Sequence, residues 1–223
     1  MPQAGPAPGR RANRAAGPGS CRWLVPLPCT RRLGKPQLKH YDNGLDLNPA
    51  CPMHPDRVLI RPLCLDDLEA VLHVQAECYG PAMQEPAAVL RARLAAAGDT
   101  AFAAVAGGAL LGYLFAYRSL LGSVTPLGAS YVPAGAPDTL YLHDLAVSPR
   151  AAGQGLARRL AQHAAQLARR EALPWCALVS VQDSQRFWEK LGYRAAACPA
   201  PQAARALASY PPLALYMTRR AHP

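Results

Sequence analysis

YLHDLAVSPRAAGQGLARRLAQHAAQL, residues 141–167, is the stretch of the sequence that decides the fold. Its first seven residues have the aromatic and apolar content of a buried strand, and Pro149 ends that strand because proline lacks the N–H that a sheet requires. The apolar residues that follow recur at helical spacing, at Leu156, Leu160, Ala164 and Leu167. Gly153 and Gly155 lie between the two elements, where a missing Cβ lets an anion approach the backbone. The stretch therefore predicts a strand, a glycine turn and a helix N-terminus that binds phosphate.

Two motifs give this arrangement a family resemblance. Residues 147–155, VSPRAAGQG, resemble the acetyl-CoA signature Q/R-x-x-G-x-G/A of the Gcn5-related N-acetyltransferase (GNAT) superfamily. Residues 187–193, FWEKLGY, are similar to the F/L-Y-E-K-L-G-F segment that members carry further along the chain. The two motifs stand in the family's order and at about its separation. The resemblance covers the chain from residue 58 to the C-terminus and implies an acetyltransferase.

Size, charge and cysteine content limit the possible classes of function. The 223 residues suffice for one domain with a full core, and their formal net charge is +10. Residues 1–55 carry eight Arg/Lys against two Asp, a balance of +6, which leaves +4 for the rest of the chain. That remainder is only mildly basic and has no motif for nucleic-acid binding. Seven cysteines without metal-site spacing predict reduced thiols in the cytoplasm, and no apolar run is long enough for a membrane span.

The first 55 residues are rich in Pro, Gly and Arg and show neither helical nor strand periodicity. This composition predicts a disordered basic extension at residues 1–55, followed by an acetyltransferase domain at residues 56–223. An organelle transit peptide is a second interpretation, although the many prolines oppose its amphipathic helix. A third is that synthesis normally starts at Met53, which we favour because MHPDRVLIRP looks like the natural start of such a domain.

The remaining segments predict the order β-α-α-β-β-β-α-β-α-β-β, which the resemblance also implies. Strands are expected at 58–61, 100–106, 110–117, 141–147, 175–181, 193–198 and 213–218. Gly107-Gly108 predicts a hairpin, and the loop 118–138 either forms one wall of the acceptor site or is a surface insertion. We therefore expect an α/β (α+β) fold with a mixed, mostly antiparallel sheet, helices on both faces, and strands splayed around the central one.

The resemblance implies acetyl-CoA as a co-substrate, and the lack of metal-ligand spacing among the cysteines and histidines predicts no metal. Backbone N–H groups of the glycine loop would bind its pyrophosphate, with positive charge from Arg150 and Arg158. The strand at 145–147 would pair with the pantetheine arm and direct one amide at the thioester oxygen. Many members have arginine where this chain has Ala152, which weakens the charge of the site but not its backbone geometry. The predicted cofactor-binding residues are Leu145, Ala146, Val147, Arg150, Ala151, Ala152, Gly153, Gln154, Gly155, Leu156, Ala157, Arg158 and Trp188.

The segment YLHDLAV also looks like the HLHxLAV segment of arylalkylamine N-acetyltransferases, whose two histidines relay the proton of the amine. Tyr141 takes the first of these positions and His143 the second. Strand alternation puts Tyr141, His143, Leu145 and Val147 on one face and Asp144 on the other, where we expect a structural role. We predict that His143 is the base or a proton relay, with a buried core histidine as the alternative.

Two further positions bear on the chemistry. Glu85 precedes Pro86, where insect relatives carry a catalytic glutamate, and is the third catalytic candidate; a helix N-terminal acid explains it equally well. Trp188 departs from the family, which commonly has tyrosine there as general acid to the thiolate. Tryptophan cannot give up a proton, so either Tyr141, Tyr131 or water protonates the thiolate, or no acid is needed.

We expect an N-acetyltransferase that transfers the acetyl group directly to the primary amine of a small molecule. The alternatives are a protein lysine or N-terminal acetyltransferase and a non-catalytic acyl-CoA-binding protein, which only Trp188 favours. An open groove beside the strand would favour a protein acceptor, and a long loop closed over the site would oppose one. The expected partners are acetyl-CoA and the amine, without nucleic acid or membrane, for a cytoplasmic monomer or homodimer.

Overall fold

The computed structural model of the protein describes residues 58–198 and 200–222. The strands are β1 (Leu59–Pro62), β2 (Phe102–Ala106), β3 (Ala109–Ser119), β4 (Thr139–Val147), β5 (Trp175–Ser180), β6 (Arg194–Ala195) and β7 (Leu215–Arg220). The α-helices are α1 (Leu68–Cys78), α2 (Ala87–Ala97), α3 (Leu156–Arg170), α4 (Gln185–Glu189) and α5 (Pro201–Leu207). The predicted extension, residues 1–55, lies outside the described residues, so the domain boundary stays a prediction.

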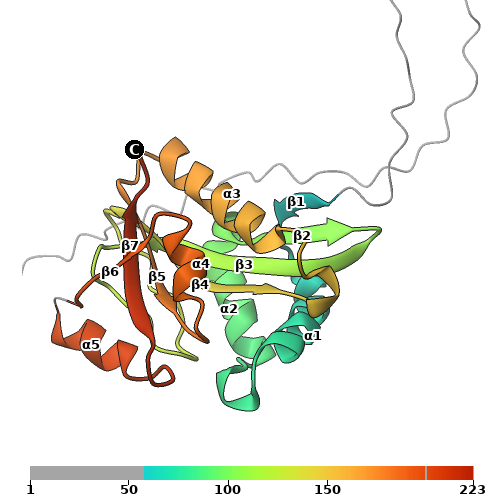
Figure 1. Ribbon diagram of the computed structural model, residues 1–223, viewed down its shortest axis with the longest axis horizontal. Coiled ribbons are helices and arrows are strands. Elements are labelled where there is room, and N and C mark those ends of the chain that lie inside the picture. The colour runs from blue at the N-terminus through green and yellow to red at the C-terminus, as the bar shows by residue number, and fades with distance from the viewer. Residues whose placement is uncertain (1–57, 199, 223) are drawn as a thin grey trace, which may run out of the picture. The chain divides into compact units, whose positions relative to one another are not determined.

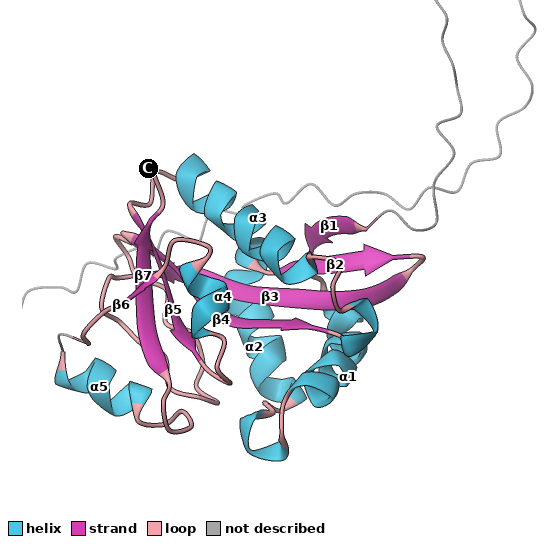
Figure 2. Ribbon diagram, in the orientation of Figure 1, coloured by secondary structure: helices cyan, strands magenta, loops and turns pink. Residues whose placement is uncertain are grey.

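The strands form one open sheet in the order β1-β2-β3-β4-β5-β7-β6 (Figures 1 and 2). Every neighbouring pair is antiparallel except β4 and β5, which run parallel and are connected through α3. The predicted mixed, mostly antiparallel fold is confirmed. The hairpin between β2 and β3 turns at Gly107 and Gly108, whose φ angles of +56° and +81° only glycine adopts easily.

Helices cover both faces of the sheet, as predicted. The α3 side is packed by residues of α3 and α4, among them Leu156, Leu160 and Trp188, against Leu114 and Leu140 of the sheet. The opposite face is covered by α1 and α2, through apolar residues that include Val71, Val74, Leu90 and Leu94. Two separate hydrophobic cores therefore lie on either side of the central strands. None of the helices in the described part of the chain combines the length and apolarity needed to cross a bilayer.

The central strands separate at one end of the sheet. Pairing between β4 and β5 runs from Thr139 and Trp175 only as far as Leu142 and Leu178, although β4 continues to Val147. Beyond Leu142 the two strands diverge, which is the splay expected from the sequence. Within the described part of the chain, the edge of β4 that faces β5 is consequently free of strand pairing over its last five residues, 143–147.

A β-bulge interrupts β4 at the same point. Phe115 of β3 pairs with Asp144 and Ala116 pairs with Leu142, so that His143 is an extra residue opposite neither. An extra residue changes the side to which every later side chain points. The bulge lies where the pairing of β4 with β5 stops. The bend of the strand and the change in which face its side chains point to therefore occur at the same position.

The bulge overturns the predicted common face of the central strand. Tyr141 belongs to the core under α1 and α2, whereas Leu145 and Val147 pack against the core under α3. Asp144 does not point away from His143 as strict alternation requires; its side chain lies with that of His143 on the α1 side. Strand alternation gave the wrong result because it assumes a regular ladder, which β4 has only up to residue 142.

The C-terminal part differs from the prediction in detail. The strand expected at 193–198 is confined to two residues, Arg194–Ala195, and the segment expected to be a plain connection contains the helix α5. Proline and alanine dominate that segment, and Pro201 is placed at the first turn of α5, where its missing N–H costs nothing.

Candidate active site

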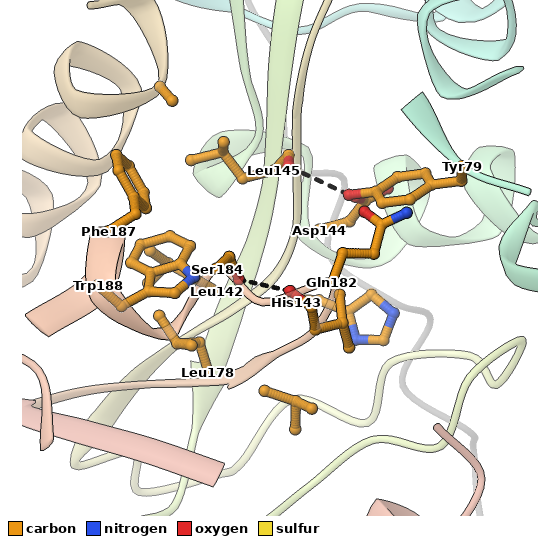
Figure 3. A pocket seen from close by; sticks show the side chains of 13 residues that line it. Tyr79, Leu142, His143, Asp144, Leu145, Leu178, Gln182, Ser184, Phe187 and Trp188 are labelled. Atoms are coloured by element: carbon orange, nitrogen blue, oxygen red, sulfur yellow. Dashed lines mark hydrogen bonds between the residues drawn. The ribbon is translucent and has the colours of Figure 1, made fainter. Parts of the chain in front are cut away.

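A cavity of about 240 Å³ occupies the gap between β4 and β5 on the side of α3 and α4. In Figure 3, Phe187 and Trp188 of α4 stand along one side of it, and Tyr79 and Asp144 stand opposite. Its lining residues are Tyr79, Leu142, His143, Asp144, Leu145, Ala157, Leu178, Val179, Val181, Gln182, Ser184, Phe187 and Trp188. The splay of the sheet therefore creates a hollow whose floor is the free edge of β4.

A second cavity, of about 30 Å³, lies on the other side of the gap. It is lined by Tyr79, Met83, Glu85, Leu127, His143, Asp144, Val179, Val181 and Tyr210. Five residues line both cavities, and we call them the shared wall: Tyr79, His143, Asp144, Val179 and Val181. Two reactants that enter from opposite sides of the sheet would meet at this wall.

The glycine loop presents a set of unpaired donors. Gly153 and Gly155 have φ angles of +78° and +71°, and α3 begins directly after Gly155. Among the described residues, none accepts a hydrogen bond from the N–H groups of Gly153, Gly155, Leu156, Ala157 and Arg158. Apart from the chain neighbours of each glycine, no atom of the described residues lies within 4 Å of where a Cβ would stand on it, so these residues leave the surface above the loop open. Free N–H groups at a helix N-terminus fit the pyrophosphate of CoA.

The arginine side chains near this loop differ from its backbone N–H groups, because one of them already contacts other residues. Arg150 is 61% exposed, and its guanidinium lies 3.3 Å from Oε1 of Glu77 at the end of α1. Its Nε also donates to Oγ of Ser148 at 3.2 Å. Arg158 is exposed on the first turn of α3. The positive charge that we expected from Arg150 is therefore shared with an acidic neighbour.

The free edge of β4 offers amide donors. A Cβ on Gly112 of β3 would lie 2.9 Å from the carbonyl oxygen of Ala146, so that carbonyl points toward β3. The carbonyls of Leu145 and Val147 point the other way, where they accept hydrogen bonds from the Tyr79 hydroxyl at 3.1 Å and the Cys78 thiol at 3.3 Å. Because N–H and C=O of one strand residue point to the same side, the N–H groups of Leu145 and Val147 face the gap.

The predicted catalytic residues His143 and Glu85 lie together, in a buried cluster with Arg93 of α2. Arg93 donates to both carboxylate oxygens of Glu85, to Oε1 at 2.6 Å, and the side chains of this pair are 0% and 4% exposed. The N–H of Gly128 donates to Oε1 as well, at 2.7 Å. Nε2 of His143 lies 3.6 Å from the same oxygen, which is longer than a hydrogen bond.

The protonation states in this cluster follow from those contacts. Burial raises the pKa of Glu85, but its contacts with His143 and Arg93 outweigh burial and lower that pKa to about 2. Burial lowers the pKa of His143 below 6.5, and the positive charge of Arg93 acts in the same direction, although Glu85 opposes both. Nδ1 of His143 has no hydrogen-bond partner among the described residues. At neutral pH, Glu85 is thus a paired carboxylate and His143 a neutral imidazole.

Of the predicted site residues Tyr141 and Trp188, only Trp188 lines a cavity. Tyr141 is 0% exposed and lines neither cavity, and its hydroxyl has no partner among the described residues. Its ring stands 6.2 Å from that of His143, centroid to centroid. Trp188 lines the larger cavity and packs edge-on against Phe187 and Tyr193. Trp188 therefore faces the space beside α3 but is not part of the shared wall.

Asp144 is held by two tyrosines that the sequence analysis did not select. Its Oδ1 accepts a hydrogen bond from the Tyr79 hydroxyl at 2.7 Å, and its Oδ2 accepts one from the Tyr113 hydroxyl at 2.9 Å. Burial raises the pKa of Asp144, and the hydrogen bonds from these tyrosines act against that rise. Tyr79 follows directly after α1, next to the Gly80-Pro81 break. Nothing in the sequence around Tyr79 indicates its position, because the contact spans 65 residues.

The loop between β3 and β4 covers the smaller cavity. Arg93 donates to the carbonyl of Ala129 at 2.8 Å, and the Tyr210 hydroxyl donates to the carbonyl of Thr125 at 2.8 Å. Tyr131 is buried and stacks on Tyr117 with ring centroids 4.3 Å apart. The loop is thus packed against the domain through Glu85 and Arg93, and its Leu127 lines the smaller cavity. That it forms a wall of the acceptor site stays a prediction.

Comparison with known proteins identifies the class to which this fold and this site belong. The model of the Acetyltransferase (GNAT) family matches residues 68–193, more than half of the chain. The chain therefore belongs to the GNAT family, and it is an acyltransferase, as the sequence motifs predicted. A search of curated protein sequences gave no significant match.

Solved structures show the same fold at low sequence identity. The loading GNATL domain of CurA from Lyngbya majuscula has a TM-score of 0.60 and 12% identity, over 74% of this chain and 98% of that one. The GphF GNAT-like decarboxylase in complex with isobutyryl-CoA has a TM-score of 0.58 and 17% identity, over 74% and 100%. The ribosomal-protein-S18-alanine N-acetyltransferase from Escherichia coli has a TM-score of 0.53 and 16% identity, over 74% and 94%.

Proposed function

We propose that the protein is an acetyl-CoA-dependent N-acetyltransferase that transfers the acetyl group directly to the primary amine of a small molecule. The observation that carries the proposal is the shared wall, where the cavity beside α3 and the cavity under the loop 120–138 meet at Tyr79, His143 and Asp144. The solved structures of this fold include a protein named as a decarboxylase, so the fold alone does not decide the reaction. The side chains at the wall support amine acetylation, because they are suited to remove protons.

The cofactor side of the site consists of three parts of the chain. The free N–H groups of the glycine loop would hold the pyrophosphate, the edge of β4 at Leu145 and Val147 would hold the pantetheine arm, and Trp188 would pack beside it. Acetyl-CoA, when bound, supplies the activated acetyl group. None of the described cysteines lines either cavity, which supports direct transfer to the amine over transfer through a covalent acyl-enzyme.

His143 is the residue to which we assign the proton of the incoming ammonium. Only the free amine attacks, and a buried neutral imidazole with an unpaired Nδ1 can accept the proton at cellular pH. Glu85 is unsuited to this step because Arg93 holds it as a carboxylate down to a pKa of about 2. We assign Glu85 a positioning role, since it contacts both His143 and the backbone of the covering loop. Tyr141 lines neither cavity and is assigned no proton.

The covered acceptor cavity supports a small substrate over a protein. Leu127 of the loop and Tyr210 after α5 both line it, and the loop is joined to the segment after α5 through the N–H of Leu127 and Oγ of Ser209 at 3.0 Å. A peptide needs an open groove beside the strand, whereas the cavity that the described residues leave on this side is only about 30 Å³. Protein lysine or N-terminal acetylation is therefore the second candidate. The cytoplasmic location and the monomeric or dimeric state stay predictions.

A screen for thiol release tests the proposal. Purified full-length protein is given acetyl-CoA with arylalkylamines, polyamines, amino acids or peptides, and free CoA is measured together with the acetylated product. We expect a small primary amine to release one thiol for each amide formed. Release with peptides alone would overturn the small-molecule acceptor. Binding of CoA without thiol release for any amine would identify a non-catalytic acyl-CoA-binding protein.

A further inference from the structure

The proposed reaction leaves one proton without a carrier. An ammonium nitrogen loses two protons when it becomes an amide, and the sulfur of CoA gains one when its bond to the acetyl carbon breaks. His143 accounts for the first proton, which passes to solvent. The second has to leave nitrogen, and its shortest route to sulfur runs within the site. Trp188 cannot carry it, because an indole N–H does not ionise near neutral pH. This inference rests on the proposed function.

Among the five residues of the shared wall, Tyr79 is the one that carries a hydroxyl group. It lines both cavities, so it borders the space on the cofactor side as well as the space on the acceptor side. Its oxygen lies 3.1 Å from the carbonyl of Leu145, on the strand edge assigned to the pantetheine arm, and 2.7 Å from Oδ1 of Asp144. Figure 3 shows the ring of Tyr79 reaching across to Leu145 and Asp144 from the end of α1. The Tyr79 hydroxyl can therefore exchange a proton with Asp144 and also donate a proton toward the cavity on the cofactor side.

Asp144 is the one carboxylate of the site that has no cation bound to it among the described residues. Glu85 is neutralised by Arg93, and His143 is neutral. The two hydrogen bonds on Asp144 come from uncharged hydroxyls, and burial raises the pKa of its carboxyl group. A buried carboxylate of this kind holds a proton more readily than an exposed one does. Asp144 can take up a proton from nitrogen and keep it until the thiolate leaves.

We propose that Asp144 and Tyr79 form a relay that carries the second proton of the amine to the thiolate of CoA. In this step the bond between nitrogen and the acetyl carbon has formed and the bond between that carbon and sulfur breaks, with its electron pair left on sulfur. Asp144 takes the proton from nitrogen, Tyr79 gives its hydroxyl proton to sulfur, and Asp144 returns a proton to Tyr79. The products are the amide and the free thiol, and both side chains end as they began.

The transfer through Tyr79 is concerted for an energetic reason. Burial and the negative charge of Asp144 raise the pKa of the Tyr79 hydroxyl well above 10. A phenolate at this position would therefore be costly, and the thiolate alone is too weak a base to produce one. Tyr79 can transfer its proton completely only while Asp144 supplies another, through the hydrogen bond of 2.7 Å between the two groups. Without that supply, Tyr79 can still offer a hydrogen bond to a thiolate in place of the one to Asp144.

Tyr113 provides a matched control. Its hydroxyl donates to the other oxygen of Asp144 at 2.9 Å, yet Tyr113 is 0% exposed and lines neither cavity. Tyr79→Phe and Tyr113→Phe each remove one hydroxyl and one hydrogen bond to the same carboxylate. Only the first removes a donor that faces the reactants. Tyr79→Phe also loses the hydrogen bond to the Leu145 carbonyl, so a purely structural role would change the melting temperatures of the two variants but the pKa of a bound thiol in neither.

The test uses CoA alone, so it does not depend on knowing the acceptor. The ultraviolet absorbance of the CoA thiolate is titrated against pH in complexes of wild type, Tyr79→Phe and Tyr113→Phe. A hydroxyl that donates to the thiolate stabilises it, so the pKa of the bound thiol should rise by about one unit in Tyr79→Phe. Tyr113→Phe should leave it near the wild-type value. Equal values in all three complexes, or equal shifts in both variants, would overturn the relay.

Turnover supplies the second measurement. With an amine found in the screen, Tyr79→Phe should lower kcat by roughly 10²-fold with little change in KM for acetyl-CoA, and Tyr113→Phe should lower it far less. If Tyr79→Phe fails to fold, Asp144→Asn carries the test, because an amide cannot hold the proton; a kcat like that of wild type would then refute the relay. A wild-type protein that acetylates no amine refutes the proposed function instead, which separates the two failures.

Discussion

At the scale of single residues, the site depends on how one histidine is placed on one strand. His143 is the extra residue of the β4 bulge, and the bulge lets its neighbour Asp144 point toward the same side. Two groups that can take protons thus follow each other in sequence and still share one wall. In a regular strand the two side chains would have been on opposite faces.

Removal of the imidazole should affect catalysis and not cofactor binding. We expect His143→Ala to lower kcat/KM by roughly 10²–10⁴-fold, the usual range for loss of a general base. Burial keeps the pKa of His143 below 6.5, and the base acts when deprotonated, so the activity of wild type should rise with pH over a range below 6.5 and level off above it. His143→Ala should lose this acidic limb while the affinity for acetyl-CoA, measured by calorimetry, stays nearly unchanged. An acidic limb retained in His143→Ala but absent from Glu85→Gln would assign the base to Glu85.

The buried pair of Glu85 and Arg93 should make the protein sensitive to acid. The pKa of Glu85 is about 2 in the folded protein against 4.5 for an unperturbed glutamate, so its contribution to stability is present above pH 4.5 and is lost as the pH falls toward 2. Glu85→Gln leaves Arg93 charged and unpaired, which should lower the unfolding free energy by about 3–5 kcal/mol near pH ~7. Denaturant unfolding of both proteins should show this difference shrinking toward pH ~3. A difference that is constant with pH would mean that Glu85 is not paired as described.

At the scale of secondary-structure elements, the start of α3 is where the phosphates should bind. The helix has apolar residues on the side that faces the sheet, and its first N–H groups lie beyond a loop that holds two glycines with positive φ. These N–H groups belong to the backbone, so a side chain on the loop would affect phosphate binding mainly by blocking access to them. The exposed glycines 153 and 155 leave that approach open.

A branched side chain on this loop should block the cofactor. We expect Gly153→Val to weaken acetyl-CoA binding at least tenfold, because its Cβ and methyl groups cover the free N–H donors. Gly108→Val is the matched control: Gly108 has a φ of +81° against +78° for Gly153, and both have open space at the Cβ position. Both variants carry the same backbone strain, so their melting temperatures should fall alike while only Gly153→Val loses affinity in calorimetry. Equal affinities in the two variants would remove the phosphate site from this loop.

At the scale of the whole molecule, the splay of the sheet determines where the two cavities of the candidate site lie. The parallel pairing of β4 with β5 stops at Leu142, and both cavities lie in the opening beyond it. One cavity is bounded by helices that follow β4 in the sequence, and the other by the loop that precedes it and by Tyr210. The cofactor and the acceptor are thereby assigned to opposite sides of one strand.

The domain proposed for residues 56–223 can be tested by truncation. Deletion of residues 1–52 should change the melting temperature by no more than about 3 °C, which corresponds to roughly 1 kcal/mol for a domain of this size. Deletion of residues 1–62 is the control, because it also removes β1, whose four residues pair with β2. That variant should be clearly destabilised. A large loss of stability in the shorter deletion would show that the residues before Met53 contribute to the fold.

Much of this protein is determined by local sequence signals. The glycine loop, the helix spacing from Leu156 to Leu167 and the Gly107-Gly108 turn each depend on residues close together in the chain, and all three were predicted correctly. The GNAT family was recognisable for the same reason, since both of its motifs are short and contiguous. Propensity and periodicity act over one or two turns of helix or strand, and within that range the sequence is sufficient.

The arrangement of the shared wall depends on the tertiary structure alone. The bulge at His143 exists because β4 pairs with β3 in a shifted register, and nothing within the segment YLHDLAV indicates the shift. Tyr79 reaches Asp144 across 65 residues, and Arg93 reaches the loop at Ala129 across 36. Such contacts arise from the packing of separate elements around the splayed strands, which no local pattern encodes. The sequence alone therefore predicted the glycine loop to which we assign the phosphates, while the direction of each titratable side chain at the shared wall depended on how distant parts of the chain come together.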